Sequence, residues 1–212
     1  MTSAAKNQVP RVPDRARRWL RAEEFPADTV ELARWLLGKI LVHDTAEGRA
    51  SGRIVETEAY VVGDASGHAF RGMTARNRSL FLARGHAYVY FVYGCWWSLN
   101  CSAEEAGVGA GALIRAMQPL AGIELMTRRR GGARLEDLAR GPGRLASALA
   151  IDRRQDGLPL YGQGALRIER GEDVEVAVGE SVRIGLSKEA KRVLRFYERG
   201  SRFVSGPARL RA

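Results

Sequence analysis

The chain has 212 residues, enough for one substantial hydrophobic core and too few for two full-sized ones. Hydrophobic residues make up 45% and charged residues 27%, which excludes a chain disordered over most of its length. The formal net charge is +10 and no stretch is long and apolar enough to span a bilayer, so a polyanionic partner is expected, nucleic acid before membrane.

The positive charge is almost entirely arginine, since the only lysines are Lys6, Lys39, Lys188 and Lys191. Guanidinium groups pair with phosphate through two hydrogen bonds, which favours nucleic acid again. The basic residues cluster in segments 11–21, 127–134 and 188–202. The alternative is that the arginines reflect the base composition of the genome and only keep the surface solvated.

Residues 1–22 are polar and basic and contain prolines, so we predict a flexible arm, followed by a single domain over residues 23–212. No apolar segment follows the first charges, so no secretory signal is expected. Cys95 and Cys101 lie close together in an apolar setting and do not form a disulfide framework. A cytoplasmic protein fits this cysteine usage.

The first elements are a helix that begins at Asp28, with apolar residues at helical spacing, and a strand after it. A turn at residues 46–48 joins that strand to another over residues 50–62, and a long polar loop follows over residues 62–79. The second strand places Glu56 and Glu58 on the same side as Ile54 and Tyr60. In a regular strand the two acids could share a proton, whereas a bulge would separate them.

Three tyrosines and two tryptophans lie within residues 88–97, a strongly alternating segment: Tyr88, Tyr90, Tyr93, Trp96 and Trp97. We predict a β-hairpin that bends near Tyr93 and Gly94. Core packing can explain some of these rings, but alternation sends neighbours to opposite faces and a tip cannot bury its own bend. An exposed tyrosine at the tip is typical of a wedge that unstacks DNA, and inward tyrosines can stack on a displaced base.

The remaining segments complete a mostly antiparallel α+β pattern without βαβ alternation. The glycine-rich residues 107–111 lead into a strand through Arg115, so they are interpreted as a turn and not as a phosphate-binding loop. Helices are predicted from residue 119 and after the Gly-Pro-Gly turn at 141–143, and two strands within 166–187. The three histidines lack metal-ligand spacing, so no metal is expected.

The order of these segments resembles the alkyladenine (3-methyladenine) DNA glycosylase family. The likeness spans about residues 25–206 and rests on RIVETEAY (53–60), GHAFRG (67–72), TARNRSLF (74–81), YVYFVYG (88–94), LN (99–100), LIRAMQPLAG (113–122), GPGRLASALAI (141–151) and LRFYERGSRFVS (194–205). The resemblance implies a single domain with a curved antiparallel sheet surrounded by helices. It also implies a protruding hairpin that enters the DNA minor groove, nucleotide flipping, and hydrolysis of the N-glycosidic bond without a cofactor.

The resemblance also implies a role for each matching residue. Glu58 matches the general base that activates water, and Arg115 a residue beside it at the phosphate or the water. The flipped base would stack between Tyr60 and Tyr90, with His68 in hydrogen-bonding reach of the base or the sugar. Asn100 would exclude the exocyclic group of guanine. Tyr93 matches the intercalating residue that fills the gap in the duplex.

Hydrolysis of an N-glycosidic bond would explain why this strand carries a carboxylate at Glu58. Cleavage of the C1′–N bond creates positive charge on the sugar, which a nearby carboxylate offsets while it orients water. Cationic purines are good leaving groups, and stacking on tyrosine favours them by about 0.5–2 kcal/mol per contact. Glu56 has the plainer interpretation of an arginine partner. No lysine lies near residues 53–118, so no Schiff base and no lyase activity is expected.

The expected activity is therefore that of a monofunctional, monomeric glycosylase of base excision repair. Its partner is double-stranded DNA containing damaged purines, of the class of 3-methyladenine, 7-methylguanine, hypoxanthine and ethenoadenine. The chain departs from the family at two places. Tyr60 and His68 are one residue closer than in the mammalian member, and Lys188 and Lys191 stand where many members carry a tryptophan.

Two other classes of protein remain open from the sequence. One is a binding module without catalysis, against which Glu58 weighs, because a carboxylate in a phosphate-binding groove weakens binding unless it does chemistry. The other is an enzyme that processes RNA bases, which would be expected to recognise 2′-hydroxyl groups. The wedge tyrosine favours duplex DNA.

Overall fold

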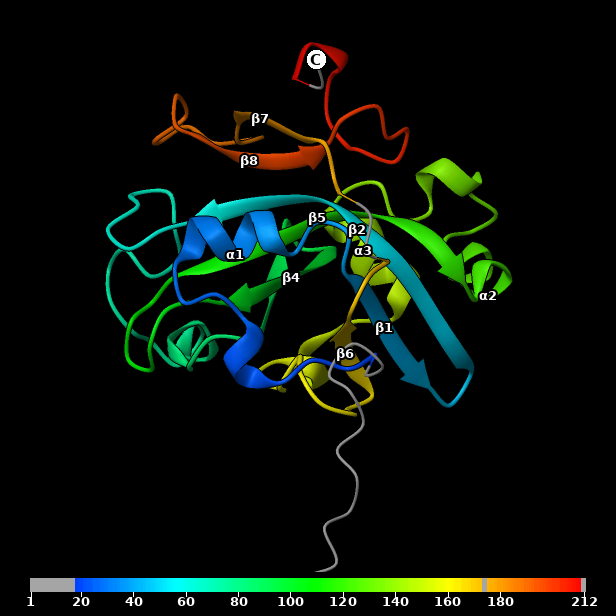
Figure 1. Cartoon of the computed structure of the whole chain (residues 1–212), viewed down its shortest axis with the longest axis horizontal. Coiled ribbons are helices and arrows are strands. Elements are labelled where there is room, and N and C mark those ends of the chain that lie inside the picture. The colour runs from blue at the N-terminus through cyan, green and yellow to red at the C-terminus, as the bar shows by residue number, and fades with distance from the viewer. Residues whose placement is uncertain (1–17, 173–174, 211–212) are drawn as a thin grey trace, which may run out of the picture.

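The computed structural model describes residues 18–172 and 175–210, and these form one curled antiparallel sheet with three α-helices (Figure 1). The single α+β domain predicted from the sequence is confirmed. The helices are α1 (Thr29–Trp35), α2 (Ile123–Arg129) and α3 (Pro142–Leu149). The strands are β1 (Ile40–Thr45), β2 (Gly48–Tyr60), β3 (Ala87–Val92), β4 (Trp96–Ser102), β5 (Gly111–Ala121), β6 (Leu166–Glu169), β7 (Val178–Val182) and β8 (Val193–Glu198).

The sheet is organised around β2, the longest strand, in the order β3-β4-β5-β2-β1-β6. Along one edge β2 pairs with β5 over most of its length. Along the other edge it pairs first with β1, up to Arg53, and then with β8, from Glu56 to Glu58. The change of partner lets the long strand curl, and it brings the C-terminal segment against the carboxylates of β2.

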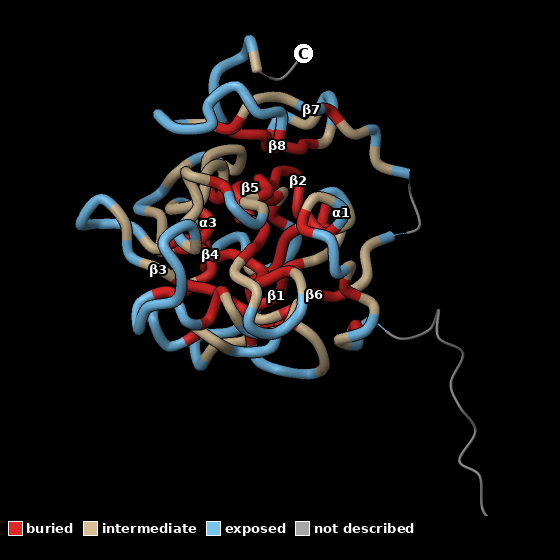
Figure 2. Tube along the Cα trace, turned by 90° about the vertical axis from the view of Figure 1, so that its left-hand side faces the viewer, coloured by how far each residue is buried: buried red, intermediate tan, exposed pale blue. Residues whose placement is uncertain are grey.

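The main core lies between the curled sheet and the helices α1 and α3. Its fully buried residues include Leu32 of α1, Ile54 of β2, Leu99 of β4 and Leu149 of α3. Figure 2 shows the buried segments running along β1, β2, β4, β5 and β8. The core therefore fixes the strands from which the site is built.

Two of the three helix starts predicted from the sequence are confirmed. The third helix, predicted from residue 119, begins only at Ile123, because residues 119–121 continue strand β5. The carboxylate of Asp28 accepts hydrogen bonds from the backbone N–H groups of Val30 and Glu31, as expected of an N-cap. Gly141 precedes α3 with a φ of 122°, and Pro142 occupies the first turn, where its missing N–H costs no hydrogen bond. None of the helices in the described part of the chain is long and apolar enough to cross a membrane.

Two other expectations need correction. Most of the predicted arm, residues 1–17, lies outside the described residues, but the packed chain begins earlier than residue 23. Trp19 bridges to Glu169, and Leu20 is fully buried as part of the hydrophobic core despite its basic neighbours. The strand β8 was not predicted, since its segment looks like a basic surface. It is in fact buried along most of its length.

Candidate active site

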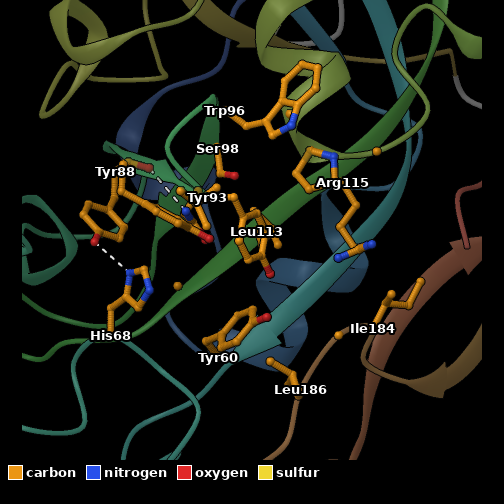
Figure 3. Close-up of a pocket in the computed structure, with 18 of the residues that line it drawn as sticks. Tyr60, His68, Tyr88, Tyr93, Trp96, Ser98, Leu113, Arg115, Ile184 and Leu186 are labelled. Carbon is orange, nitrogen blue, oxygen red and sulfur yellow. Dashed lines mark hydrogen bonds between the residues drawn. The ribbon is translucent and has the colours of Figure 1, made fainter.

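A cavity of about 460 Å³ opens between β2, β3, β4, β5, the start of α3 and residues 184–186 (Figure 3). Its volume is in the range of small-molecule sites. Six of the seven residues singled out from the sequence line it: Tyr60, His68, Tyr90, Tyr93, Asn100 and Arg115. The seventh, Glu58, is fully buried and lies directly behind this lining.

Strand β3 supplies an aromatic wall. The rings of Tyr88 and Tyr90 are stacked, with centroids 5.4 Å apart, and His68 meets Tyr90 edge-on at 4.4 Å. The Nδ1 atom of His68 is 2.9 Å from the hydroxyl oxygen of Tyr88. Burial raises the pKa of both tyrosines, and partial burial with the nearby Arg76 lowers the pKa of His68. The wall is therefore uncharged at neutral pH.

Tyr60 connects the cavity to the buried carboxylate. Its hydroxyl donates a hydrogen bond to Oε2 of Glu58 at 3.0 Å. Burial raises its pKa, and the negative charge of Glu58 adds to the effect, so Tyr60 keeps its proton. The guanidinium carbon of Arg183 lies 4.6 Å from the centre of the ring. Tyr60 is thus held by contacts on its edge and on its face.

Glu58 is fixed by three contacts from three different segments. Its Oε1 accepts a hydrogen bond of 2.8 Å from the backbone N–H of Ile184, and its Oε2 lies 3.2 Å from Nη1 of Arg115. The hydroxyl of Tyr60 is the third contact. Ile184, Arg115 and Tyr60 all line the cavity. A carboxylate held in this way is positioned to act on a group bound among them.

Glu56 has a different environment, although it is only two residues away. Its Oε1 accepts hydrogen bonds from Nε of Arg115 at 2.8 Å, Nε of Arg195 at 2.7 Å and the hydroxyl of Ser205 at 2.9 Å. Burial by itself favours the protonated acid, but the two guanidinium groups hold the pKa of Glu56 below its ordinary value. Glu56 is therefore an ionised arginine partner, as the plainer interpretation expected.

Two irregularities in the pairing of β2 with β5 set the directions of the side chains of Glu56 and Arg115. The register shifts between Ile54 and Glu56, which leaves Val55 as an extra residue on β2. A second shift leaves Arg115 as the extra residue on β5. A bulged residue is free of the regular ladder and can point elsewhere. The bulge on β2 precedes Glu56 and does not separate the two acids, which both contact the guanidinium of Arg115.

The hairpin of β3 and β4 turns at residues 93–95, where the alternation predicted its bend. The side chain of Tyr93 is 84% exposed and its φ is 53°, a left-handed conformation that is unusual for a bulky residue. Trp96, at the start of β4, packs against α3, and a Cβ atom at Gly143 would lie 2.8 Å from its ring. The hairpin tip and the helix start therefore meet beside the cavity.

Three buried polar residues of the site were missed from the sequence. Arg183 pairs with Asp64 and donates to the carbonyl of Ala59 at 2.9 Å. Arg195 is fully buried and, with Ser205, binds Glu56. Arg195 lies in a segment that looks like a basic surface, and the apolar neighbours of Arg195 in β8 were the only indication of its burial. Arg183 lies within the strands predicted over residues 166–187, where no pattern marked it as buried. Within residues 18–172 and 175–210, no group of three His, Cys, Asp or Glu side chains could hold a metal ion.

The site thus combines an aromatic wall with a buried carboxylate behind it, within a basic antiparallel fold. The comparisons with known proteins identify the family. Residues 23–202 match the family model described as methylpurine-DNA glycosylase (MPG), and the chain belongs to this family of DNA repair enzymes.

The chain is similar to several curated proteins over nearly its whole length. It is 62% identical to a protein of Mesorhizobium japonicum, over 88% of this chain and 90% of the relative. It is 54% identical to a protein of Paraburkholderia phytofirmans, over 97% of this chain and 93% of the relative. It is 42% identical to a protein of Methanoculleus marisnigri, over 88% of this chain and 98% of the relative. Each relative bears the name "Putative 3-methyladenine DNA glycosylase".

Proposed function

We propose that the protein excises alkylated or deaminated purines from duplex DNA and leaves an abasic site, with Glu58 activating the attacking water. The observation that supports this most is the position of Glu58, which is buried yet bonded to Tyr60, Arg115 and Ile184 of the cavity wall. The names of the relatives support 3-methyladenine as a substrate. The wider class of 7-methylguanine, hypoxanthine and ethenoadenine follows from the resemblance.

In the proposed mechanism the damaged nucleotide turns out of the duplex and its base enters the cavity. The base stacks between Tyr60 and Tyr90 while the sugar comes to lie near Glu58. The C1′–N bond breaks with its electron pair going to the base, and the oxygen of a water molecule bonds to C1′. Glu58 takes the proton of that water, and its charge offsets the positive charge that develops on the sugar.

Three other residues have proposed roles in recognition. His68, as a neutral imidazole, makes a hydrogen bond to the base or the sugar. Asn100 donates to the carbonyl of Tyr88, which fixes its carboxamide in the wall, and an amino group on a guanine would meet it there. Tyr93, exposed at the hairpin tip, fills the gap that the flipped nucleotide leaves in the duplex.

The proposed enzyme is monofunctional, needs no cofactor and acts as a monomer. A lyase would need an amine at the abasic sugar to form a Schiff base. No lysine is among the described residues that line the cavity. Lys188 is exposed and follows the lining residue Leu186 by two positions, so it is the residue to examine if strand cleavage is found.

The test is base release from a duplex containing one hypoxanthine or one stable 3-methyladenine analogue, with alkali used to reveal abasic sites. We expect release by the parent and a loss of about 10²-fold or more in Glu58→Gln, with binding of the lesion duplex retained. The matched control Glu180→Gln removes an exposed carboxylate that pairs with Arg34 outside the cavity. Parental rates in Glu58→Gln would disprove the role of Glu58, and strand cleavage without alkali would disprove the monofunctional reaction.

A further inference from the structure

The loop between β2 and β3 displays two large apolar side chains on a fixed backbone. Phe70 is 53% exposed and Met73 58%. Asn77 is buried and holds the loop from inside. Its Nδ2 donates to the carbonyls of His68 at 2.8 Å and Gly72 at 3.0 Å, and its Oδ1 accepts from the N–H of Thr74 at 2.6 Å. The loop is thus built to keep these side chains in solvent.

The same loop is continuous with the cavity and with the hairpin. His68 lines the cavity at one end of the loop (Figure 3). At the other end, Nη2 of Arg76 donates a hydrogen bond of 3.0 Å to the carbonyl of Phe91 in β3, and the ring of Phe91 is itself partly exposed. Residues 68–76, which we call the apolar loop, therefore form one surface with the outer part of the hairpin.

The charge of this surface is unbalanced. Residues 65–103 contain the apolar loop and the whole hairpin, and none of them is Asp or Glu. The acid just before them, Asp64, is buried and paired with Arg183. Arg71, Arg76 and Arg78 are exposed. A surface that combines exposed apolar groups with arginines and lacks carboxylates complements a partner with both phosphates and apolar faces, which are the features of a nucleic-acid groove.

We propose that the apolar loop is a second DNA contact, in which Phe70 and Met73 pack against sugar and base faces while Arg71 binds a phosphate. This contact would hold the duplex at the mouth of the cavity, next to the hairpin. It rests on the proposed function only in taking duplex DNA as the partner, because binding of undamaged DNA requires no chemistry.

The salt dependence of binding separates the two kinds of contact. Each phosphate contact releases condensed cations, so its removal lowers the slope of log K against log salt concentration by about 0.9. An apolar contact releases none, so its removal weakens binding equally at every salt concentration. Binding of an undamaged duplex, measured by fluorescence anisotropy over a range of KCl concentrations, can therefore tell them apart.

Three variants complete the test. We expect Phe70→Ser/Met73→Ser to raise Kd about tenfold, the loss expected for roughly one base-stacking interaction. The slope against salt concentration should stay unchanged. Arg71→Gln should raise Kd and lower the slope by about 0.9. The control Leu120→Ser replaces an apolar residue that is 47% exposed at the far end of β5, about 17 Å along the strand from Arg115 of the cavity wall, and should bind as the parent does.

The proposal is overturned if the double variant binds DNA as tightly as the parent, or if Leu120→Ser loses as much affinity. It is also overturned if the double variant loses affinity for vesicles of anionic phospholipid and not for DNA, since the loop would then be a membrane contact. Equal thermal midpoints for all variants establish that folding is unaffected. A parent that binds DNA through the loop but releases no base would overturn the proposed reaction and leave this contact standing.

Discussion

Two glutamates of one strand show how far neighbours decide the role of a residue. Glu56 and Glu58 have the same side chain, the same burial and a common contact with Arg115. Glu56 is also bound by Arg195 and Ser205, whereas Glu58 meets Tyr60 at the cavity wall. The sequence could suggest different roles for the two acids. It could not show that Glu56 is bound by Arg195, a residue 139 positions further along the chain.

The ionised state of Glu56 predicts an acid-dependent stability. A carboxyl group whose pKa is lowered by folding stabilises the fold fully above its unfolded value, 4.5, and this contribution is lost as the pH falls through the lowered folded value. Glu56→Gln removes the charge that pairs with both Arg115 and Arg195, and it should lower the free energy of unfolding at pH 7 by about 3–5 kcal/mol. The difference between parent and variant should shrink below pH 4.5.

Urea unfolding at pH 7, 5 and 3 would measure this difference. The control Glu180→Gln removes a half-exposed carboxylate whose ion pair with Arg34 contributes less than about 1 kcal/mol. A difference between parent and Glu56→Gln that stays constant over this pH range would show that Glu56 is not the ionised partner of the two arginines.

At the scale of elements, the alternation of residues predicted the hairpin and its bend, because side-chain direction in a strand has a period of two. The pairing of Glu56 with Ala116 could not be predicted in the same way. It depends on bulges at Val55 and Arg115, which cannot be predicted from the local sequence pattern. Strand β8 was missed for a related reason, since a buried arginine such as Arg195 has the sequence appearance of a surface residue.

The conformation of Tyr93 predicts a conflict between stability and function. A left-handed φ of 53° costs an ordinary residue roughly 1–2 kcal/mol, and asparagine tolerates it better. The ring is mostly exposed, so Tyr93→Asn loses little packing and should raise the free energy of unfolding by up to about 1 kcal/mol. If the ring is the wedge, the same variant should excise lesions from duplex DNA more slowly and from single strands at the parental rate.

Chemical denaturation and excision assays on matched duplex and single-stranded substrates would measure both effects. Cys95→Ser, an exposed change at the same tip, is the control and should alter neither. Unchanged excision from duplexes by Tyr93→Asn would remove Tyr93 from the DNA contact, even if the gain in stability is found.

For the whole molecule, the strongly patterned segments predicted the fold class, and the resemblance to the family pointed to six of the residues that line the cavity. The sequence did not predict how the ends of the chain close the structure. Residues 193–205 return to β2 and supply Arg195 and Ser205 to its buried carboxylate, and Leu20 joins the core. Such contacts between distant segments are set by the packing of the complete domain.

The net charge of +10 leads to a prediction about residues 1–17 of the predicted N-terminal arm, which lie outside the described residues. Residues 1–17 contain Lys6, Arg11, Arg15 and Arg17 against a single acid, Asp14. If they bind phosphates, a chain that begins at Arg18 should bind duplex DNA less tightly at low salt and with a smaller slope against salt concentration, by about 0.9 for each phosphate that the arm neutralises. Base release in single turnovers at saturating protein should stay at the parental rate, because every residue of the candidate site belongs to the remaining chain. A truncated chain with the parental slope would show that the charge acts through the folded domain alone, and a slower single turnover would give the arm a part in forming the site.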